Sequence, residues 1–211
     1  MKLKHSFLSI LLTLLCCVSL AQSFNGTIHF QKINYLDTTN YVYYIFGDNV
    51  RIDELDNKNQ TIGTMLVDLK TEKVYALNHL RKLYIELNRK PTTKDLSKTK
   101  YVKTNETKTI LGKTAVKWEV SNKTYKSIAT YWVIEGNYDF FKKTLSIVKQ
   151  KDLLSLYFLS IPENQNVFPI LSEEVTEDGV LRTRFEVMKI IPNDHLTIGF
   201  SIPEDYQLFQ N

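Results

Sequence analysis

The chain has 211 residues, with 27 lysine and arginine residues against 23 aspartate and glutamate residues, and a formal net charge of +4 at pH 7. So small a positive charge argues against a nucleic-acid-binding protein. Hydrophobic residues make up 43% of the chain, which is enough for one well-packed core, so a single domain is expected.

The first residues predict a secretory signal peptide. Lys2 and Lys4 precede an apolar run over Phe7–Val18, and a small-x-small pattern ends at Ala21, where cleavage is expected. The apolar run is too short to make a good membrane span. We therefore expect residues 1–21 to be removed and residues 22–211 to form one domain, most simply in the periplasm.

Both cysteines, Cys16 and Cys17, lie inside the predicted signal peptide. Lipid attachment at one of them is the alternative to cleavage, but the preceding residues are larger than those usually found before a lipidated cysteine. Without cysteines, the mature chain can form neither disulfides nor thiolate metal sites, and it has no cysteine nucleophile. Removal of Lys2 and Lys4 from the 27 basic residues leaves 25 against 23 acidic ones, a net charge of +2.

The first half of the mature chain alternates strand-like runs with short polar turns. Connections of a few residues force consecutive strands to pair antiparallel, because a parallel neighbour needs a crossover of a dozen or more residues. The pattern therefore predicts an antiparallel meander. The expected strands of the meander are Tyr41–Phe46, Val50–Leu55, Thr61–Leu69, Lys73–Leu77 and Leu83–Leu87. A further strand, Phe24–Ile33, is expected to open the mature chain.

Residues 88–108 differ from what precedes them, since they contain many lysines and threonines and few apolar side chains. Such a stretch buries little apolar area, so it is interpreted as a long, mobile, basic loop. Its functional interpretation is a basic patch for anionic lipid headgroups or sugars, and the first of these would allow peripheral membrane contact. A solvated connector is the simpler interpretation.

The second half predicts further strands around a helix. Phe141, Leu145 and Val148 follow one another at helical spacing, and the apolar run Leu153–Ile161 suggests that one principal helix continues until Pro162. The expected strands are Thr114–Val120, Ser127–Ile134, Phe168–Val175, Val180–Ile190 and Leu196–Ile202.

The predicted elements indicate a mainly β fold with one principal helix (α+β). About ten strands cannot close into a small barrel filled by side chains, so an antiparallel meander forming an open or half barrel is expected. The apolar helix would cap or plug it. The sequence does not distinguish a helix that fills the interior from one that encloses a cavity.

Recognisable catalytic and metal-binding patterns are absent from the sequence. The seven glycines are scattered singly, so there is no phosphate-binding loop and no nucleophile elbow. His29, His79 and His195 are far apart, and none belongs to a metal-binding pair. We expect no catalytic residues, no metal and no cofactor. An enzyme without a visible motif is the alternative, because catalytic residues need only meet in space.

Several motifs resemble a family of secreted bacterial proteins of unknown function. They are FNGTI at 24–28, YYIFGDNVRID at 43–53, VDLKTEKVYAL at 67–77, ETKTILGKTAVKWEV at 106–120 with the later Trp132, and FSIPEDY at 200–206. That family is distantly similar to the periplasmic lipoprotein carriers of Gram-negative bacteria, the lipoprotein-localisation proteins. The resemblance implies a half barrel that holds acyl chains under a helical cap. It carries over no headgroup-binding residue, because the shared motifs are turns with flanking strands.

The first functional hypothesis is non-catalytic binding of a lipid or lipoprotein acyl chain in an apolar pocket. The candidate lining residues are Tyr41, Tyr43, Ile45, Met65, Trp118 and Trp132, and Trp132 would lie near Trp118 if their strands pair. The alternative is an envelope scaffold or interaction protein with a filled core, which would capture a protein partner through the basic loop or a sheet edge.

Overall fold

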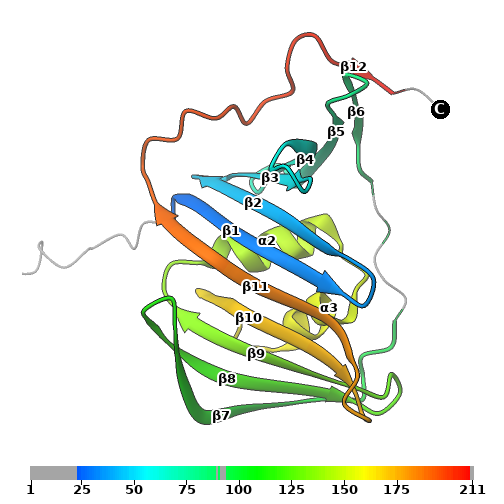
Figure 1. The fold of residues 1–211 in the computed structure, drawn as a ribbon, viewed down its shortest axis with the longest axis vertical. Coiled ribbons are helices and arrows are strands. Elements are labelled where there is room, and N and C mark those ends of the chain that lie inside the picture. Colours follow the sequence, from blue (N-terminus) through cyan, green and yellow to red (C-terminus); the bar gives the residue numbers. More distant parts are fainter. Residues whose placement is uncertain (1–22, 89, 91–93, 210–211) are drawn as a thin grey trace, which may run out of the picture.

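The computed structural model describes residues 23–88, 90 and 94–209, which form one twelve-stranded sheet and two helices (Figure 1). The sheet is open, because its first and last strands do not pair with each other. The predicted signal peptide, with Cys16 and Cys17, lies outside the described residues. The strand order is β12-β6-β5-β4-β3-β2-β1-β11-β10-β9-β8-β7.

The first half of the sheet is the predicted meander. Five consecutive strands pair antiparallel with their neighbours, which confirms the sequence prediction. The turn after β2 contains Gly47, whose φ of +56° is easily reached by a residue without a side chain. The strands are β2 (Thr38–Phe46), β3 (Asn49–Leu55), β4 (Thr61–Asp68), β5 (Lys73–Asn78) and β6 (Leu83–Glu86).

The second half forms another antiparallel series, and β1 (Gly26–Asn34) joins the two halves. It lies between β2 and β11, antiparallel to both. The open half barrel expected from the sequence is confirmed. The remaining long strands are β7 (Thr99–Ile110), β8 (Lys113–Asn122), β9 (Ser127–Glu135), β10 (Val167–Thr176) and β11 (Leu181–Pro192).

The expected mobile loop at 88–108 is wrong over much of its length. Residues 99–110 form β7, which pairs with β8 along one side and leaves its other side unpaired. Most β7 side chains are exposed, so backbone hydrogen bonds rather than apolar burial hold it in place. Residues 89 and 91–93 lie outside the described part of the chain.

The strand expected at Leu196–Ile202 is also wrong. This segment passes β2 and β3 without joining the sheet, and Arg51 Nη1 donates to the carbonyl oxygen of Gly199 at 3.0 Å. The pairing positions beside β2 and β3 are already filled by neighbouring strands. Only β12 (Gln207–Leu208) pairs, parallel to β6 at the sheet edge.

Two helices replace the single helix that the sequence predicts. α2 (Asp139–Val148) ends at Lys149, which adopts a left-handed conformation, and α3 (Leu153–Ser160) begins after Asp152. The Asp152 carboxylate accepts a hydrogen bond from the Ser155 amide at 2.8 Å and so caps α3. Both helices cover the same face of the sheet, which we call the inner face (Figure 1). α3 is buried over most of its length.

Candidate functional site

A cavity of about 200 Å³ lies between the inner face of the sheet and the two helices. Strands β1 to β4 and β9 to β11 line one side of it, and α2 and α3 line the other. The lining is dominated by rings, with Met65, Leu145 and Leu154 among the aliphatic members. The aromatic residues are Phe30, Tyr41, Tyr43, Tyr131, Phe141, Phe158, Phe168 and Phe185.

The aromatic rings pack on one another in two groups. On the sheet, the centroid of Phe30 lies 5.2 Å from Tyr41, 4.7 Å from Tyr43 and 5.9 Å from Phe185. On the helices, Phe141 of α2 lies 5.4 Å from Phe158 of α3. Offset and edge-to-face packing of this kind holds the rings in fixed orientations, so the cavity has a defined shape.

Charged side chains also reach the cavity. Lys32 comes from β1, Glu54 from the end of β3, and Asp152 from the connection between α2 and α3. The Lys32 ammonium lies 5.4 Å from the centroid of the Phe185 ring. The cavity therefore combines an aromatic wall with two carboxylates and one ammonium group.

Burial raises the pKa of three tyrosines at the cavity, Tyr41, Tyr43 and Tyr131. It raises the pKa of Tyr43, and repulsion from an ionised Tyr41 and from Asp152 adds to this effect. Burial likewise raises the pKa of Tyr131, with Asp152 and Glu174 contributing, and that of Tyr41, with Glu54 contributing. These hydroxyl groups therefore keep their protons at neutral pH and act as neutral hydrogen-bonding groups.

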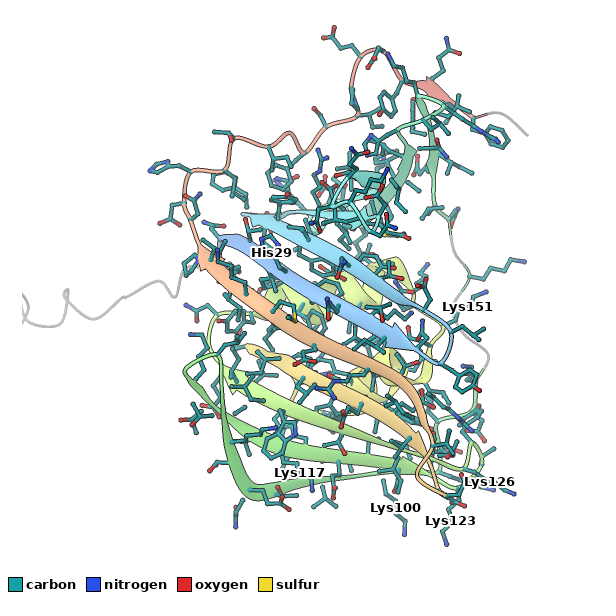
Figure 2. The ribbon with its side chains drawn as sticks, in the orientation of Figure 1. His29, Lys100, Lys117, Lys123, Lys126 and Lys151 are labelled. Carbon is teal, nitrogen blue, oxygen red and sulfur yellow. The ribbon has the colours of Figure 1, made fainter. Side chains whose placement is uncertain are left out.

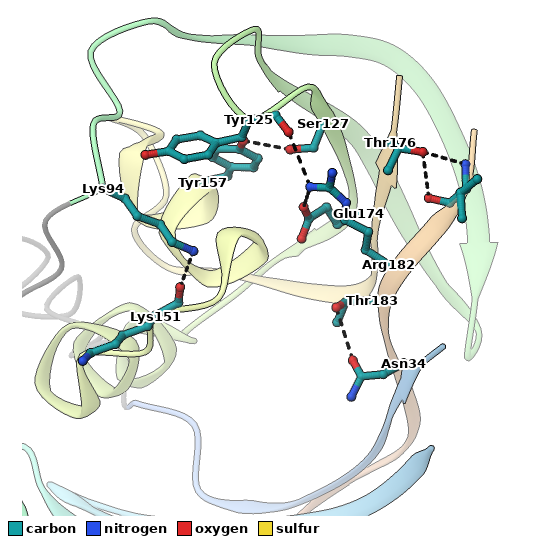
Figure 3. A network of polar contacts seen from close by, with 11 residues as sticks. Asn34, Lys94, Tyr125, Ser127, Lys151, Tyr157, Glu174, Thr176, Arg182 and Thr183 are labelled. Atoms are coloured by element: carbon teal, nitrogen blue, oxygen red, sulfur yellow. Dashed lines mark hydrogen bonds and ion pairs between the residues drawn. The ribbon is translucent and has the colours of Figure 1, made fainter. Parts of the chain in front are cut away.

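Helix α3 is tied to the sheet by hydrogen bonds beside the cavity. Tyr131 of β9 donates its hydroxyl proton to the Leu154 carbonyl oxygen at 2.6 Å. The hydroxyls of Ser127 and Tyr157 share a hydrogen bond of 2.9 Å (Figure 3). Nearby, the buried carboxylate of Glu174 accepts from Arg182 at 3.2 Å.

The candidate residues from the sequence divide into three groups. Tyr41, Tyr43 and Met65 line the cavity. Ile45 is fully buried in the neighbouring core and is not part of the lining, and Trp118 is buried in the core cluster that includes α3.

Trp132 lies on the outer face of the sheet, where the Lys108 ammonium is 5.7 Å from its ring. The expected proximity of Trp118 and Trp132 is wrong, although their strands do pair. Trp118 is opposite Tyr131, and successive side chains of a strand point to opposite faces, so Trp118 and Trp132 lie on opposite sides.

The candidate residues from the sequence do not include the cavity residues contributed by the helices and by the late strands. Phe141 and Leu145 belong to the predicted helix stripe, and Phe185 lies in the expected strand Val180–Ile190 between the charged residues Arg184 and Glu186, so the sequence carries a signal for these residues. Phe158 gave no such signal, because α3 is apolar on nearly all sides.

A second polar cluster lies on β3 and β4 and at the residue that follows β5. The Thr64 hydroxyl donates to the buried carboxylate of Asp53 at 2.6 Å and is 2.7 Å from His79 Nε2. Because that hydroxyl donates to Asp53, it accepts from His79, which places a proton on Nε2. His79 Nδ1 contacts the Tyr206 hydroxyl at 2.6 Å, so the cluster attaches the C-terminal segment to the sheet.

Arg51 completes this cluster by pairing with both carboxylate oxygens of Asp53, at 2.8 and 3.1 Å.

Within residues 23–88, 90 and 94–209, no group of three or more histidine, cysteine or acidic residues could hold a metal ion. None of the helices in this same part of the chain combines the length and the apolar character that crossing a membrane requires.

The protein belongs to the family described as Domain of unknown function (DUF4412), whose model matches residues 24–206. This match confirms the resemblance to a family of unknown function. No curated protein matches the chain.

Several solved structures are similar to this chain, to different degrees. An uncharacterized conserved protein from Thermus thermophilus is 9% identical, with 96% of this chain and 99% of that chain covered, at a TM-score of 0.56. MucB, in the complex structure of Pseudomonas aeruginosa MucA/MucB, is 12% identical, with 90% and 58% covered, at a TM-score of 0.50. The present chain thus spans little more than half of that protein. A putative outer membrane lipoprotein-sorting protein domain from Vibrio parahaemolyticus is 8% identical, with 81% and 85% covered, at a TM-score of 0.30.

Proposed function

We propose that this protein is a non-catalytic, periplasmic binder of a lipid or lipoprotein acyl chain. The single observation that carries this proposal is the cavity beneath α2 and α3, whose wall is built mainly from aromatic and aliphatic side chains. A wall of this kind suits a hydrocarbon chain, which is stabilised by leaving water and makes no hydrogen bonds. The signal peptide pattern at residues 1–21 supports the proposed location.

The size of the cavity sets a condition on binding. At about 200 Å³ it is smaller than the range of about 300–1,000 Å³ that is typical of small-molecule sites. A long acyl chain therefore enters only if α2 and α3 move away from the sheet. The connection between the two helices, residues 149–152, has no regular structure and provides a place for such movement.

Capture of an envelope protein is the second candidate function. The unpaired side of β7 favours it, because an edge strand of 12 residues offers free backbone groups to an extended partner segment. Lysines on β7 oppose indiscriminate pairing and would select an acidic partner. This candidate predicts partner binding that does not depend on the cavity.

Filling the cavity distinguishes the two functions. Ser172 of β10 is buried, lines the cavity and lies opposite Tyr131 and Phe185, which line it too. We expect Ser172→Leu to weaken binding of a neutral alkyl glycoside with a twelve-carbon chain, used below its micelle concentration, by about tenfold. Isothermal titration calorimetry measures the affinity, and native mass spectrometry counts the bound molecules.

The matched control is Ser121→Leu, which places the same side chain at an exposed position of β8. It should bind the glycoside as the unchanged protein does. If the unchanged protein takes up no glycoside, or if Ser172→Leu binds it with full affinity, the cavity is not the binding site and protein capture becomes the leading function.

A further inference from the structure

The carboxylates at the cavity have no cationic partner among the described residues. Glu54 and Asp152 are half-buried, and among the described residues no lysine, arginine or histidine forms an ion pair with either of them. The Asp152 carboxylate accepts a hydrogen bond from the Ser155 amide. Half-buried carboxylates are usually paired, because removing a charge from water is costly.

The one lysine of the lining does not neutralise these groups. Lys32 packs against Phe185 at 5.4 Å from the ring centroid and forms an ion pair with neither carboxylate. The cavity wall therefore already holds an ammonium group on an aromatic ring. Aromatic faces attract cations, and recognition of ammonium ligands by surrounding rings is a general use of that attraction.

The two carboxylates act on the same rings that form this wall. The charge of Glu54 helps to raise the pKa of Tyr41, after the larger effect of burial, and the charge of Asp152 does the same for Tyr43. Tyr41 and Tyr43 both pack on Phe30, which in turn packs on Phe185. The two carboxylates and the aromatic rings therefore line the same cavity.

We propose that the amphiphile bound in this cavity carries a positively charged ammonium group, held by Glu54, Asp152 and the surrounding aromatic rings. The proposal rests on the proposed function, since the apolar part of the same ligand would occupy the cavity. It separates two classes of amphiphile. A fatty acid would bring a third carboxylate to a site with two, whereas an alkylammonium compound supplies the missing countercharge.

Matched probes test the headgroup directly. Dodecyltrimethylammonium, dodecanoate and the neutral dodecyl glycoside share a twelve-carbon chain, and each is titrated at pH 7 below its micelle concentration. We expect the ammonium probe to bind at least about tenfold more tightly than dodecanoate, with the glycoside between them. Dodecanoate binding as well as or better than the ammonium probe overturns the proposal while leaving the acyl-chain function standing. Failure of all three probes to bind overturns both.

Charge-removing variants locate the effect. Glu54→Gln combined with Asp152→Asn removes both charges, and asparagine remains a good cap for α3. We expect this double variant to lose most of the preference for ammonium over dodecanoate. Its control, Glu86→Gln combined with Asp194→Asn, removes two exposed carboxylates outside the cavity lining and should keep the preference. Equal preference in the two double variants would place the recognition elsewhere.

Lys32→Met should change the affinity for the ammonium probe in the opposite direction to removal of the two carboxylate charges. Removing the ammonium group that competes for the aromatic wall should tighten dodecyltrimethylammonium binding by severalfold. If Lys32 instead pairs with an anionic headgroup, the same variant weakens dodecanoate binding and leaves the ammonium probe unimproved. That result would reverse the sign of the proposed ligand charge.

Discussion

At the scale of single residues, the tyrosine hydroxyl of Tyr131 joins the sheet to the helix that closes the cavity. It is fully buried, and its bond to the Leu154 carbonyl oxygen attaches the first turn of α3 to β9. A buried hydrogen bond of this kind typically stabilises a protein by about 1 kcal/mol, and a buried group left without a partner costs more.

We therefore expect Tyr131→Phe to lower the free energy of unfolding by about 1–2 kcal/mol. Urea titration followed by circular dichroism measures the change. The control is Tyr75→Phe on β5, where the ring packs on Tyr84 and the hydroxyl bonds no other described residue. A loss of stability in Tyr75→Phe as large as that in Tyr131→Phe would mean that the bond to α3 is not the cause.

His29 provides a pH-dependent contribution to stability. It lies on β1, on the sheet face turned away from the helices (Figure 2), and burial together with the charge of Lys189 lowers its pKa. The unfolded chain, with an ordinary histidine pKa of about 6.5, then binds protons more readily than the folded one. This contribution is fully present above about pH 6.5 and is lost as the pH falls through the lower pKa of the folded state.

Replacing this histidine should flatten the pH profile. We expect His29→Gln to reduce the slope of unfolding free energy against pH between about pH 5 and 7, measured by urea titration at several pH values. His195→Gln, at an exposed turn position, is the control and should keep the slope. An unchanged slope in His29→Gln would assign the acid sensitivity to other groups.

At the scale of elements, the break between α2 and α3 depends on local backbone chemistry. Lys149 has φ and ψ of 52°, a left-handed conformation in which residues other than glycine are strained. Its amide still donates to the Leu145 carbonyl oxygen at 3.1 Å, so it closes the last turn of α2. The chain then turns back over the sheet as α3.

Glycine at this position should relieve the strain. We expect Lys149→Gly to raise the free energy of unfolding by about 1 kcal/mol, measured by urea titration. Ser146→Gly, at an exposed position inside α2, should lower it by about 0.5–1 kcal/mol. If both variants destabilise the protein, the left-handed cap is not a site of stored strain.

The same break shows why sequence reasoning predicted one helix. The stripe of Phe141 and Leu145 and the run at 153–161 are each compatible with a helix, but nothing in residues 149–152 is a glycine or proline that would mark an end. The end of α2 depends instead on one lysine in a left-handed conformation and on the Asp152 cap. Lysine is not a residue type that marks a left-handed helix end, and the Asp152 cap is a local signal that the predicted single helix does not take into account.

Strand β7 was missed for a different reason. Sequence patterns detect strands through buried side chains, and β7 is held by its backbone pairing with β8 while its side chains face water. The meander β2 to β6 could be predicted because its turns are short and its apolar residues alternate. The candidate site was predicted only in part, because a cavity depends on which faces meet, and the opposite faces of Trp118 and Trp132 follow from a register that no local pattern specifies.

At the scale of the whole molecule, the two meanders meet at one seam, the pairing of β1 with β11. Gly26 lies opposite Pro192 and Asn34 opposite Thr183, so residues near the two ends of the domain are neighbours in the middle of the sheet. The cavity lies beneath this seam, with Phe30 and Lys32 on one side and Phe185 and Val187 on the other. Each half contributes part of the lining, so neither half alone encloses the cavity.

This seam also determines when the molecule can fold. Hairpins such as β2–β3 and β8–β9 close over a few residues and can form within microseconds, whereas β1 must wait for a strand about 150 residues further along the chain. While the chain is being synthesised, the edge of β1 that faces β11 stays unpaired until nearly the whole domain is available. The pairing of β1 with the distant strand β11 is thus the expected slow step of folding. Until that pairing forms, the exposed edge of β1 is the place where a chaperone would act or aggregation would begin.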